Sequence, residues 1–164
     1  MKKLYLHIGT EKTGTTLLQE WLYTNKKNLS KNGIYLPNQL EEPNNILLPT
    51  YFQGHLDDWA WSKRIQNKQE KDIFFEGFLN RVTDEITTAK NNHDTFIITS
   101  EHFHSRLQLI EEIQNLYVFL KSLFDEIYII CYFREQFDTA ISLYSTFLKR
   151  EEVRDIDSFL NYGD

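Results

Sequence analysis

Short runs of almost uninterrupted apolar residues alternate with longer segments of helical pattern along this chain. Such strands belong to parallel sheets that helices cover on both faces, because the crossover connections place helices there. The sequence therefore predicts an α/β fold of three layers, with a central parallel sheet flanked by helices. The expected strands are residues 4–9 (LYLHIG), 33–37 (GIYLP), 94–100 (DTFIITS) and 126–133 (EIYIICYF).

The segments between these strands are less regular. A helix is expected from Thr15 onward, and residues 107–124 and 138–150 are expected to form two more. Residues 37–58 carry all three prolines and no clean period, which indicates an irregular excursion outside the core. Residues 59–91 are expected to form one or two helices. The first helix would bury one apolar face, made by Leu17, Leu18, Trp21, Leu22 and Leu29.

Composition limits both the domain count and the partners. The 164 residues suit one domain that spans 1–164. The net charge of -6 disfavours nucleic acid or an anionic membrane as a partner, since either needs a broad basic face. The single cysteine, Cys131, excludes an internal disulfide and is expected to be a buried strand thiol. The apolar start is too short for a signal peptide, so we expect a soluble, cytoplasmic protein.

The stretch from Leu4 to Gln19, LYLHIGTEKTGTTLLQ, reads as a strand, a loop bracketed by glycines and a helix start. Backbone N–H groups and the positive end of a helix dipole converge in such a loop, which makes it an anion cradle. The loop that binds nucleoside triphosphates has the form G-x-x-x-x-G-K-[ST], with lysine directly after the second glycine. Here Thr15 stands at that position and the lysine, Lys12, lies inside the loop.

A second anion site is expected after the last predicted strand. Arg134 follows that strand, and Asp138 is a good N-cap for a helix that begins at Thr139. Ser142 then falls near the start of this helix. A guanidinium and a hydroxyl in this arrangement can hold one phosphate together.

A candidate general base follows the strand 94–100. Ser100, Glu101, His102 and His104 lie just beyond its end, where open parallel sheets bind ligands. Glu101 or His102 could remove a proton from a hydroxyl or amine, although a salt bridge and partly exposed histidines explain the same residues. No third ligand accompanies the two histidines, so no metal is expected. His7, inside the first strand, is expected to be a hydrogen-bonded core residue.

Two of these motifs carry a resemblance to a known family. The order HIGTEKTGTT followed by LLQ, and the pattern of Arg134, seven residues, Ser142 and then Tyr144, resemble the nucleotide-binding N-terminal half of the sulfotransferases. These enzymes use 3'-phosphoadenosine 5'-phosphosulfate (PAPS). The resemblance implies a P-loop-like fold and a nucleotide cosubstrate without a metal.

The resemblance also implies roles for individual residues. The loop residues Lys12, Thr13, Gly14, Thr15 and Thr16 would bind the 5'-phosphosulfate, and Arg134 with Ser142 would bind the 3'-phosphate. Lys12 would also neutralise charge on the bridging oxygen during transfer. Glu101 matches the base of the carbohydrate-modifying branch, whereas the small-molecule branch uses a histidine, which keeps His102 as the alternative.

Three functional hypotheses follow. The first is sulfuryl transfer from PAPS to a hydroxyl or amine, with a carbohydrate as one candidate acceptor. The second is an inactive or truncated remnant that binds PAPS or its product, because the sequence shows no match to the C-terminal part of the family. The third is a P-loop kinase or NTPase, which would need Glu101 to organise magnesium. The aromatic segment 51–61 is expected to pack in the core, with a lid or an acceptor wall as the alternative. The acceptor and the oligomeric state stay open.

Overall fold

A four-stranded sheet lies at the centre of the protein. The computed structural model describes residues 1–149, and its strands are all parallel, in the order β2-β3-β1-β4. In register, Leu6 lies beside Ile98 on one side and Ile129 on the other. The α/β class and the parallel sheet predicted from the sequence are therefore confirmed. The strands are β1 (Lys3–His7), β2 (Ile34–Tyr35), β3 (Thr95–Thr99) and β4 (Glu126–Ile130).

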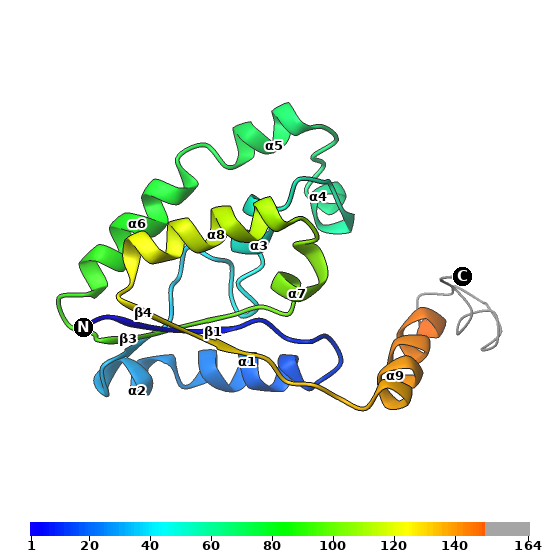
Figure 1. The fold of residues 1–164 in the computed structure, drawn as a ribbon, viewed down its shortest axis with the longest axis horizontal. Coiled ribbons are helices and arrows are strands. Elements are labelled where there is room, and N and C mark those ends of the chain that lie inside the picture. The colour runs from blue at the N-terminus through cyan, green and yellow to red at the C-terminus, as the bar shows by residue number, and fades with distance from the viewer. Residues whose placement is uncertain (150–164) are drawn as a thin grey trace.

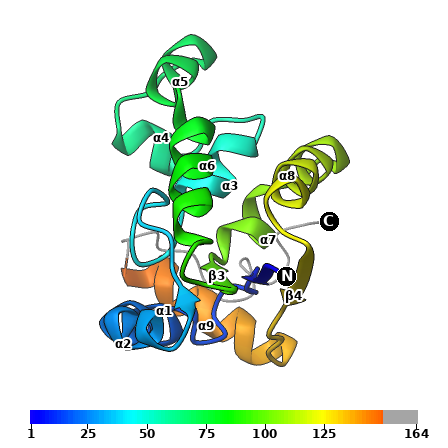
Figure 2. The ribbon, with the colours of Figure 1, turned by 90° about the vertical axis from the view of Figure 1, so that its left-hand side faces the viewer.

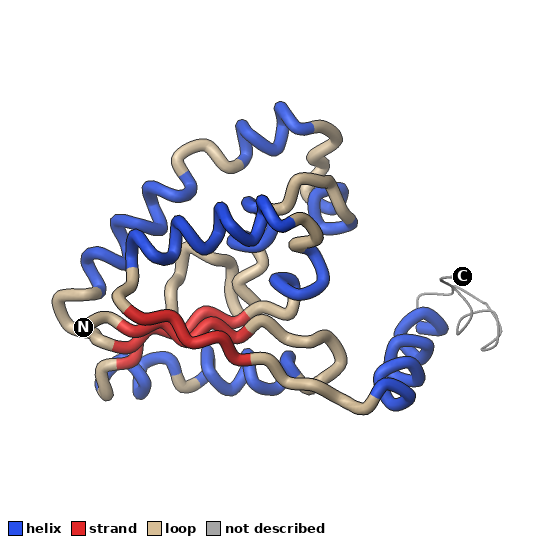
Figure 3. The backbone as a smooth tube through the Cα atoms, viewed as in Figure 1, coloured by secondary structure: helices blue, strands red, loops and turns tan. Residues whose placement is uncertain are grey.

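Helices lie on both faces of this sheet (Figures 1 and 3). One face carries α1 (Thr15–Thr24) and α2 (Lys26–Lys31). The opposite face carries the remaining helices up to β4, of which α4 and α5 lie farthest from the sheet (Figure 2). They are α3 (Leu47–Phe52), α4 (Asp58–Ser62), α5 (Lys68–Phe74), α6 (Phe78–Ala89), α7 (His102–Arg106) and α8 (Ile110–Leu123). The last described helix, α9 (Gln136–Lys149), projects beyond the carboxyl edge of the strands (Figure 1).

The main core lies between the sheet and α6 and α8. The central strands contribute Leu4, Leu6, Phe96 and Ile98, all nearly or fully buried. The helices contribute buried residues spaced four positions apart, Val82 and Ile86 on α6 and Leu116 and Leu120 on α8. This packing fixes the carboxyl ends of β1 and β3, from which the candidate site is built.

The expected apolar face of α1 is only partly buried. The described structure buries Thr15, Gln19 and Leu22, while Leu17 and Trp21 are 74% and 56% exposed. The buried side of α1 begins with Thr15, which lines a polar cavity, so two of its three buried residues are polar. The stripe read from leucine and tryptophan spacing was therefore wrong for these two residues.

The segment 37–58 is not outside the core, contrary to expectation. It contains α3, and it buries Leu40, Ile46 and Leu48 in the main cluster. Pro49 lies in the first turn of α3, where a residue without an N–H is tolerated because that donor has no intrahelical partner. Proline content therefore indicated turns correctly but did not exclude burial.

The region 59–91 forms three helices, and the expected one or two was too few. The side chains of Asp57 and Asn67 accept hydrogen bonds from the first turns of α4 and α5, and Gly77, with φ 67°, precedes α6. Because each of these three residues precedes the start of a helix, the region 59–91 is divided into three helices although its sequence pattern is nearly continuous.

The strand β4 is less buried than predicted. It pairs with β1 and is the last strand of the sheet within residues 1–149, and Ile129 is 58% exposed. Cys131, just after the strand, is half-buried. None of the helices within residues 1–149 combines the length and the hydropathy that crossing a bilayer requires.

Candidate functional site

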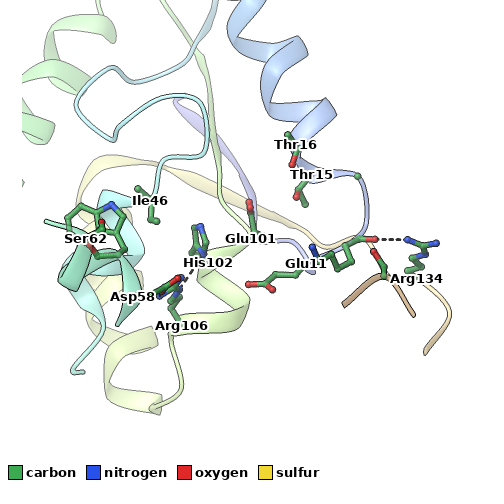
Figure 4. A pocket seen from close by; sticks show the side chains of 14 residues that line it. Glu11, Thr15, Thr16, Ile46, Asp58, Ser62, Glu101, His102, Arg106 and Arg134 are labelled. Atoms are coloured by element: carbon green, nitrogen blue, oxygen red, sulfur yellow. Dashed lines mark hydrogen bonds and ion pairs between the residues drawn. The ribbon is translucent and has the colours of Figure 1, made fainter. Parts of the chain in front are cut away.

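A cavity of about 760 Å³ opens at the carboxyl ends of β1 and β3 (Figure 4). The chain leaves β1 through α1 on one face of the sheet, and it leaves β3 through α7 and α8 on the other. Adjacent parallel strands whose connections diverge in this way form a crevice that commonly binds ligands. Its lining residues are Glu11, Lys12, Gly14, Thr15, Thr16, Ile46, Asp58, Trp59, Ser62, Glu101, His102, Arg106, Arg134 and Ser142.

The loop after β1 has an unusual backbone. Gly9, Lys12 and Gly14 all have positive φ, of 104°, 62° and 84°. A Cβ atom on Gly9 would lie 3.0 Å from the Cα of Glu101, so glycine allows the loop to approach the end of β3 closely. Residues in sparsely populated backbone regions tend to gather at functional sites.

The N-terminus of α1 faces this loop without a side-chain cap. Gly14 is the N-cap residue and supplies no capping side chain. The amides of Thr15 and Thr16 in the first turn have no intrahelical acceptor, since the first turn of any helix leaves its donors free. Together with the helix dipole, they give this end of the cavity a positive character.

Lys12 connects the loop to α9. Its ammonium donates a 2.7 Å hydrogen bond to the hydroxyl of Thr146. Thr13 stabilises the turn itself, since its hydroxyl donates to the carbonyl of Thr10 at 2.6 Å. The lysine inside the loop is thus held against a helix that starts 124 residues later in the chain.

Arg134 lies against the same loop. Its guanidinium donates a 3.2 Å hydrogen bond to the carbonyl of Lys12 and is 3.9 Å from the carboxylate of Asp138. Ser142 lines the cavity from α9. The structure therefore brings residues of both predicted anion regions into one cavity, while Thr13 of the loop is not among the residues that line it.

The start of α9 differs from the prediction. The helix begins at Gln136, so Asp138 is in its first turn and is not the N-cap. The side chain of Glu135 instead accepts from the amide of Asp138, at 3.0 Å. Ser142 accordingly falls in the second turn of the helix. Glutamate is a less common capping residue than aspartate, which explains why the sequence pattern favoured Asp138.

Glu101 lies near the middle of the cavity, between Thr15 and Arg134 on one side and Asp58 on the other (Figure 4). One carboxylate oxygen, Oε2, accepts a 2.6 Å hydrogen bond from the side-chain amide of Gln19. Within residues 1–149 the other oxygen, Oε1, has no hydrogen-bond partner, so it can accept a proton or a donor from a ligand.

His102 lies beside Glu101 on α7. Burial lowers the pKa of its ring, while the nearby charge of Glu101 acts in the opposite direction. The Nε of Arg106 donates to its Nδ1 at 3.4 Å. Because Nδ1 accepts, the neutral ring carries its proton on Nε2. His102 is therefore arranged as a donor, and Glu101 is the better placed of the two candidate bases.

Arg106 is a site residue that the sequence reasoning missed. Its guanidinium forms ion pairs with Asp57 and with Asp58, the latter at 2.8 Å. Burial alone would raise the pKa of Asp57, but the amide of Ala60 and the charge of Arg106 hold this pKa below its usual range. The only sequence signal was the i, i+4 spacing from His102 to Arg106, which puts both on one helix face.

The other histidines stand apart from this chemistry. His7 is 2% exposed, and its Nδ1 is 2.8 Å from the hydroxyl of Thr99, as expected for a core histidine. Burial lowers its pKa, against the opposing effect of Glu101. His104 is exposed on α7. Within residues 1–149, no group of three or more histidine, cysteine or acidic side chains is arranged to hold a metal ion.

A scan against protein-family models finds no model that matches this chain, and a search of curated proteins finds no match either.

Proposed function

We propose that this protein is a PAPS-dependent sulfotransferase with a P-loop-like fold. One observation carries the proposal: a single cavity is lined by four loop residues, by Arg134 and Ser142, and by Glu101, whose Oε1 has no hydrogen-bond partner among residues 1–149. The four loop residues are Lys12, Gly14, Thr15 and Thr16. The resemblance of the loop and of the Arg134 segment to this family supports it independently of the geometry.

The end of the cavity near α1 suits a nucleotide with two separate anionic groups. The first-turn amides of α1 and the ammonium of Lys12 would hold the 5'-phosphosulfate. Arg134 and Ser142, on the α9 side, would hold the 3'-phosphate, the guanidinium by charge-assisted hydrogen bonds. The Arg134 side chain is 42% exposed, so its guanidinium can turn from its contact with Lys12 toward a ligand.

The reaction would proceed by direct displacement. The acceptor oxygen or nitrogen forms a bond to sulfur while the bond between sulfur and the bridging phosphate oxygen breaks. The acceptor proton passes to Oε1 of Glu101, and the bridging oxygen keeps the electron pair as 3',5'-diphosphoadenosine leaves. Lys12 stabilises the negative charge that grows on that oxygen.

Calorimetric titration tests the nucleotide specificity. We expect 3',5'-diphosphoadenosine to bind more tightly than ADP or ATP, and to need no magnesium. Preference for ATP with magnesium would contradict the proposal and favour the kinase or NTPase hypothesis. Binding of diphosphoadenosine without any sulfuryl transfer from PAPS to a panel of acceptors would instead identify an inactive remnant.

A further inference from the structure

The part of the cavity farthest from the loop is formed by α4 and α7. It is lined by Ile46, Asp58, Trp59, Ser62, His102 and Arg106 (Figure 4). We propose that it binds a polyhydroxy acceptor that is neutral or carries an amine, such as a neutral sugar or an amino sugar, and that it discriminates against acidic sugars. This inference rests on the proposed function, since it concerns the acceptor of the same site.

Among the described residues that line this region, no unpaired cation is available to bind an anionic acceptor. Arg106 is the cation of this part of the cavity among the described residues, and Asp57 and Asp58 already pair with it. The other lining cations, Lys12 and Arg134, lie together at the loop end, where the guanidinium contacts the carbonyl of Lys12. Two aspartates against one guanidinium leave the acceptor end with excess negative charge, to which Glu101 adds. The ammonium of Lys63, 5.5 Å from the centre of the Trp59 ring, is paired with Glu41 and does not line the cavity.

A like charge is unfavourable in such a cavity, because the effective dielectric constant there is lower than in water. An acidic acceptor would meet Asp58 and Glu101 without a compensating cation, and this mismatch gives specificity against it. An ammonium group would be attracted by the same carboxylates.

The polar groups of this region suit hydroxyls. The carboxylate of Asp58 is 63% exposed and can accept from a ligand beyond its contact with Arg106. The hydroxyl of Ser62 donates to the carbonyl of Trp59 at 2.7 Å and keeps its lone pairs for acceptance.

Trp59 gives this part of the cavity an aromatic wall. The residue lines the cavity and is 9% exposed, so it is held in place by the surrounding core. An aromatic wall beside hydrogen-bonding groups suits the mixed apolar and polar faces of a sugar ring.

Three sugars of similar size test the inference: D-glucosamine, N-acetyl-D-glucosamine and D-glucuronate. Their binding to the full chain is measured by calorimetry and by saturation-transfer NMR, with and without saturating 3',5'-diphosphoadenosine. We expect the first two to bind at least about tenfold more tightly than glucuronate, on the scale of one unfavourable like-charge contact.

The variant Asp58→Asn examines the source of this preference, with Asp84→Asn as the control. Asp84 is an exposed residue of α6, so its variant makes the same change of net charge away from the cavity. We expect Asp58→Asn to reduce the preference for glucosamine over glucuronate about tenfold, because Arg106 loses one of its two partners. The control should keep the wild-type ratio.

The outcomes separate the two proposals. Tighter binding of glucuronate, binding of none of the sugars, or an equal effect of the two variants would overturn the acceptor inference while leaving nucleotide binding intact. Failure of diphosphoadenosine to bind, with the sugar preference unchanged, would instead overturn the proposed function. If Asp58→Asn does not fold, the ratio of the wild-type affinities for glucosamine and glucuronate still decides the acceptor inference.

Discussion

The side-chain amide of Gln19 donates a 2.6 Å hydrogen bond to the carboxylate of Glu101, which lies 82 residues further along the chain. Gln19 is 2% exposed and belongs to α1, the helix that starts at the anion loop. The bond orients one carboxylate oxygen, Oε2, and leaves the other, Oε1, without a hydrogen-bond partner among residues 1–149. The helix that would hold the nucleotide therefore also positions the candidate base.

The first prediction concerns that base. Replacement of Glu101 by Gln should reduce sulfuryl transfer by ~10²–10⁴-fold, the usual contribution of a general base. The affinity for diphosphoadenosine should change little, since the amide keeps the shape and removes the basicity. Transfer assays and calorimetry on the same preparations check this. The control is His102→Ala, and a larger loss of transfer in that variant would move the base to His102.

The second prediction concerns Lys12. The variant Lys12→Ala should lower kcat by ~10²–10³-fold, as expected when one donor to a developing oxyanion is removed, and should weaken nucleotide binding much less. The variant Thr146→Val is the control, because it removes the hydrogen-bond partner of Lys12 and keeps its charge. Equal losses of turnover and affinity in Lys12→Ala would make the lysine a binding residue only.

The third prediction concerns the 3'-phosphate. The variant Arg134→Ala should weaken diphosphoadenosine binding by about 1.5–3 kcal/mol, the range for a hydrogen bond to a charged group. Discrimination against the analogue without the 3'-phosphate should disappear with it. Arg81→Ala, on the exposed side of α6, should leave both quantities unchanged. If the Arg134 variant still prefers the 3'-phosphorylated form, this phosphate binds elsewhere.

The fourth prediction concerns Gly9. A methyl group there would lie 3.0 Å from the Cα of Glu101, at a φ of 104°. Gly9→Ala should therefore lower the free energy of unfolding by about 1–3 kcal/mol, as measured with urea. Gly33→Ala is the matched control, because Gly33 also has positive φ, 78°, but a methyl group on it would meet no described atom within 4 Å. Equal losses in both variants would show that the approach to Glu101 costs nothing.

The fifth prediction concerns pH. The pKa of His7 is lowered in the folded state, first by burial, so the unfolded chain binds its proton more readily. The free energy of unfolding should therefore fall as pH drops below about 6.5, the unfolded pKa, through the lower folded pKa. Urea titrations from pH 7 to 5 should show a shallower decline for His7→Asn than for the wild type. The exposed His104 provides the control, and a shallower decline in His104→Asn alone would contradict the assignment.

The parts of the fold that the sequence predicted well are those with strong local signals. The apolar runs of β1 and β3, and the glycines that bracket the loop, depend on neighbouring residues only. Glu101 follows β3 and the loop follows β1. Because the carboxyl ends of parallel strands lie at one edge of a sheet, the sequence could predict that these two segments lie close together.

What the sequence could not give depends on distant partners. Nothing in the neighbouring sequence indicates that Arg106 pairs with Asp57 and Asp58, nearly fifty residues earlier. The three prolines of segment 37–58 suggested an exposed loop, although the segment contributes residues to the core. The exposure of Leu17 and Trp21 likewise depends on what packs against α1. The spacing of apolar residues does not identify which face of a helix is covered.

The two ends of the cavity come from different stretches of chain, one from the loop after β1 and α9, the other from α4 and α7. The α4 wall belongs to the long connection between β2 and β3, away from the strands that order the loop. Under the proposed function, substitutions in that connection would alter which acceptor binds while nucleotide binding would stay unchanged. Residues 57–62 are therefore the natural segment to exchange in order to redirect acceptor preference.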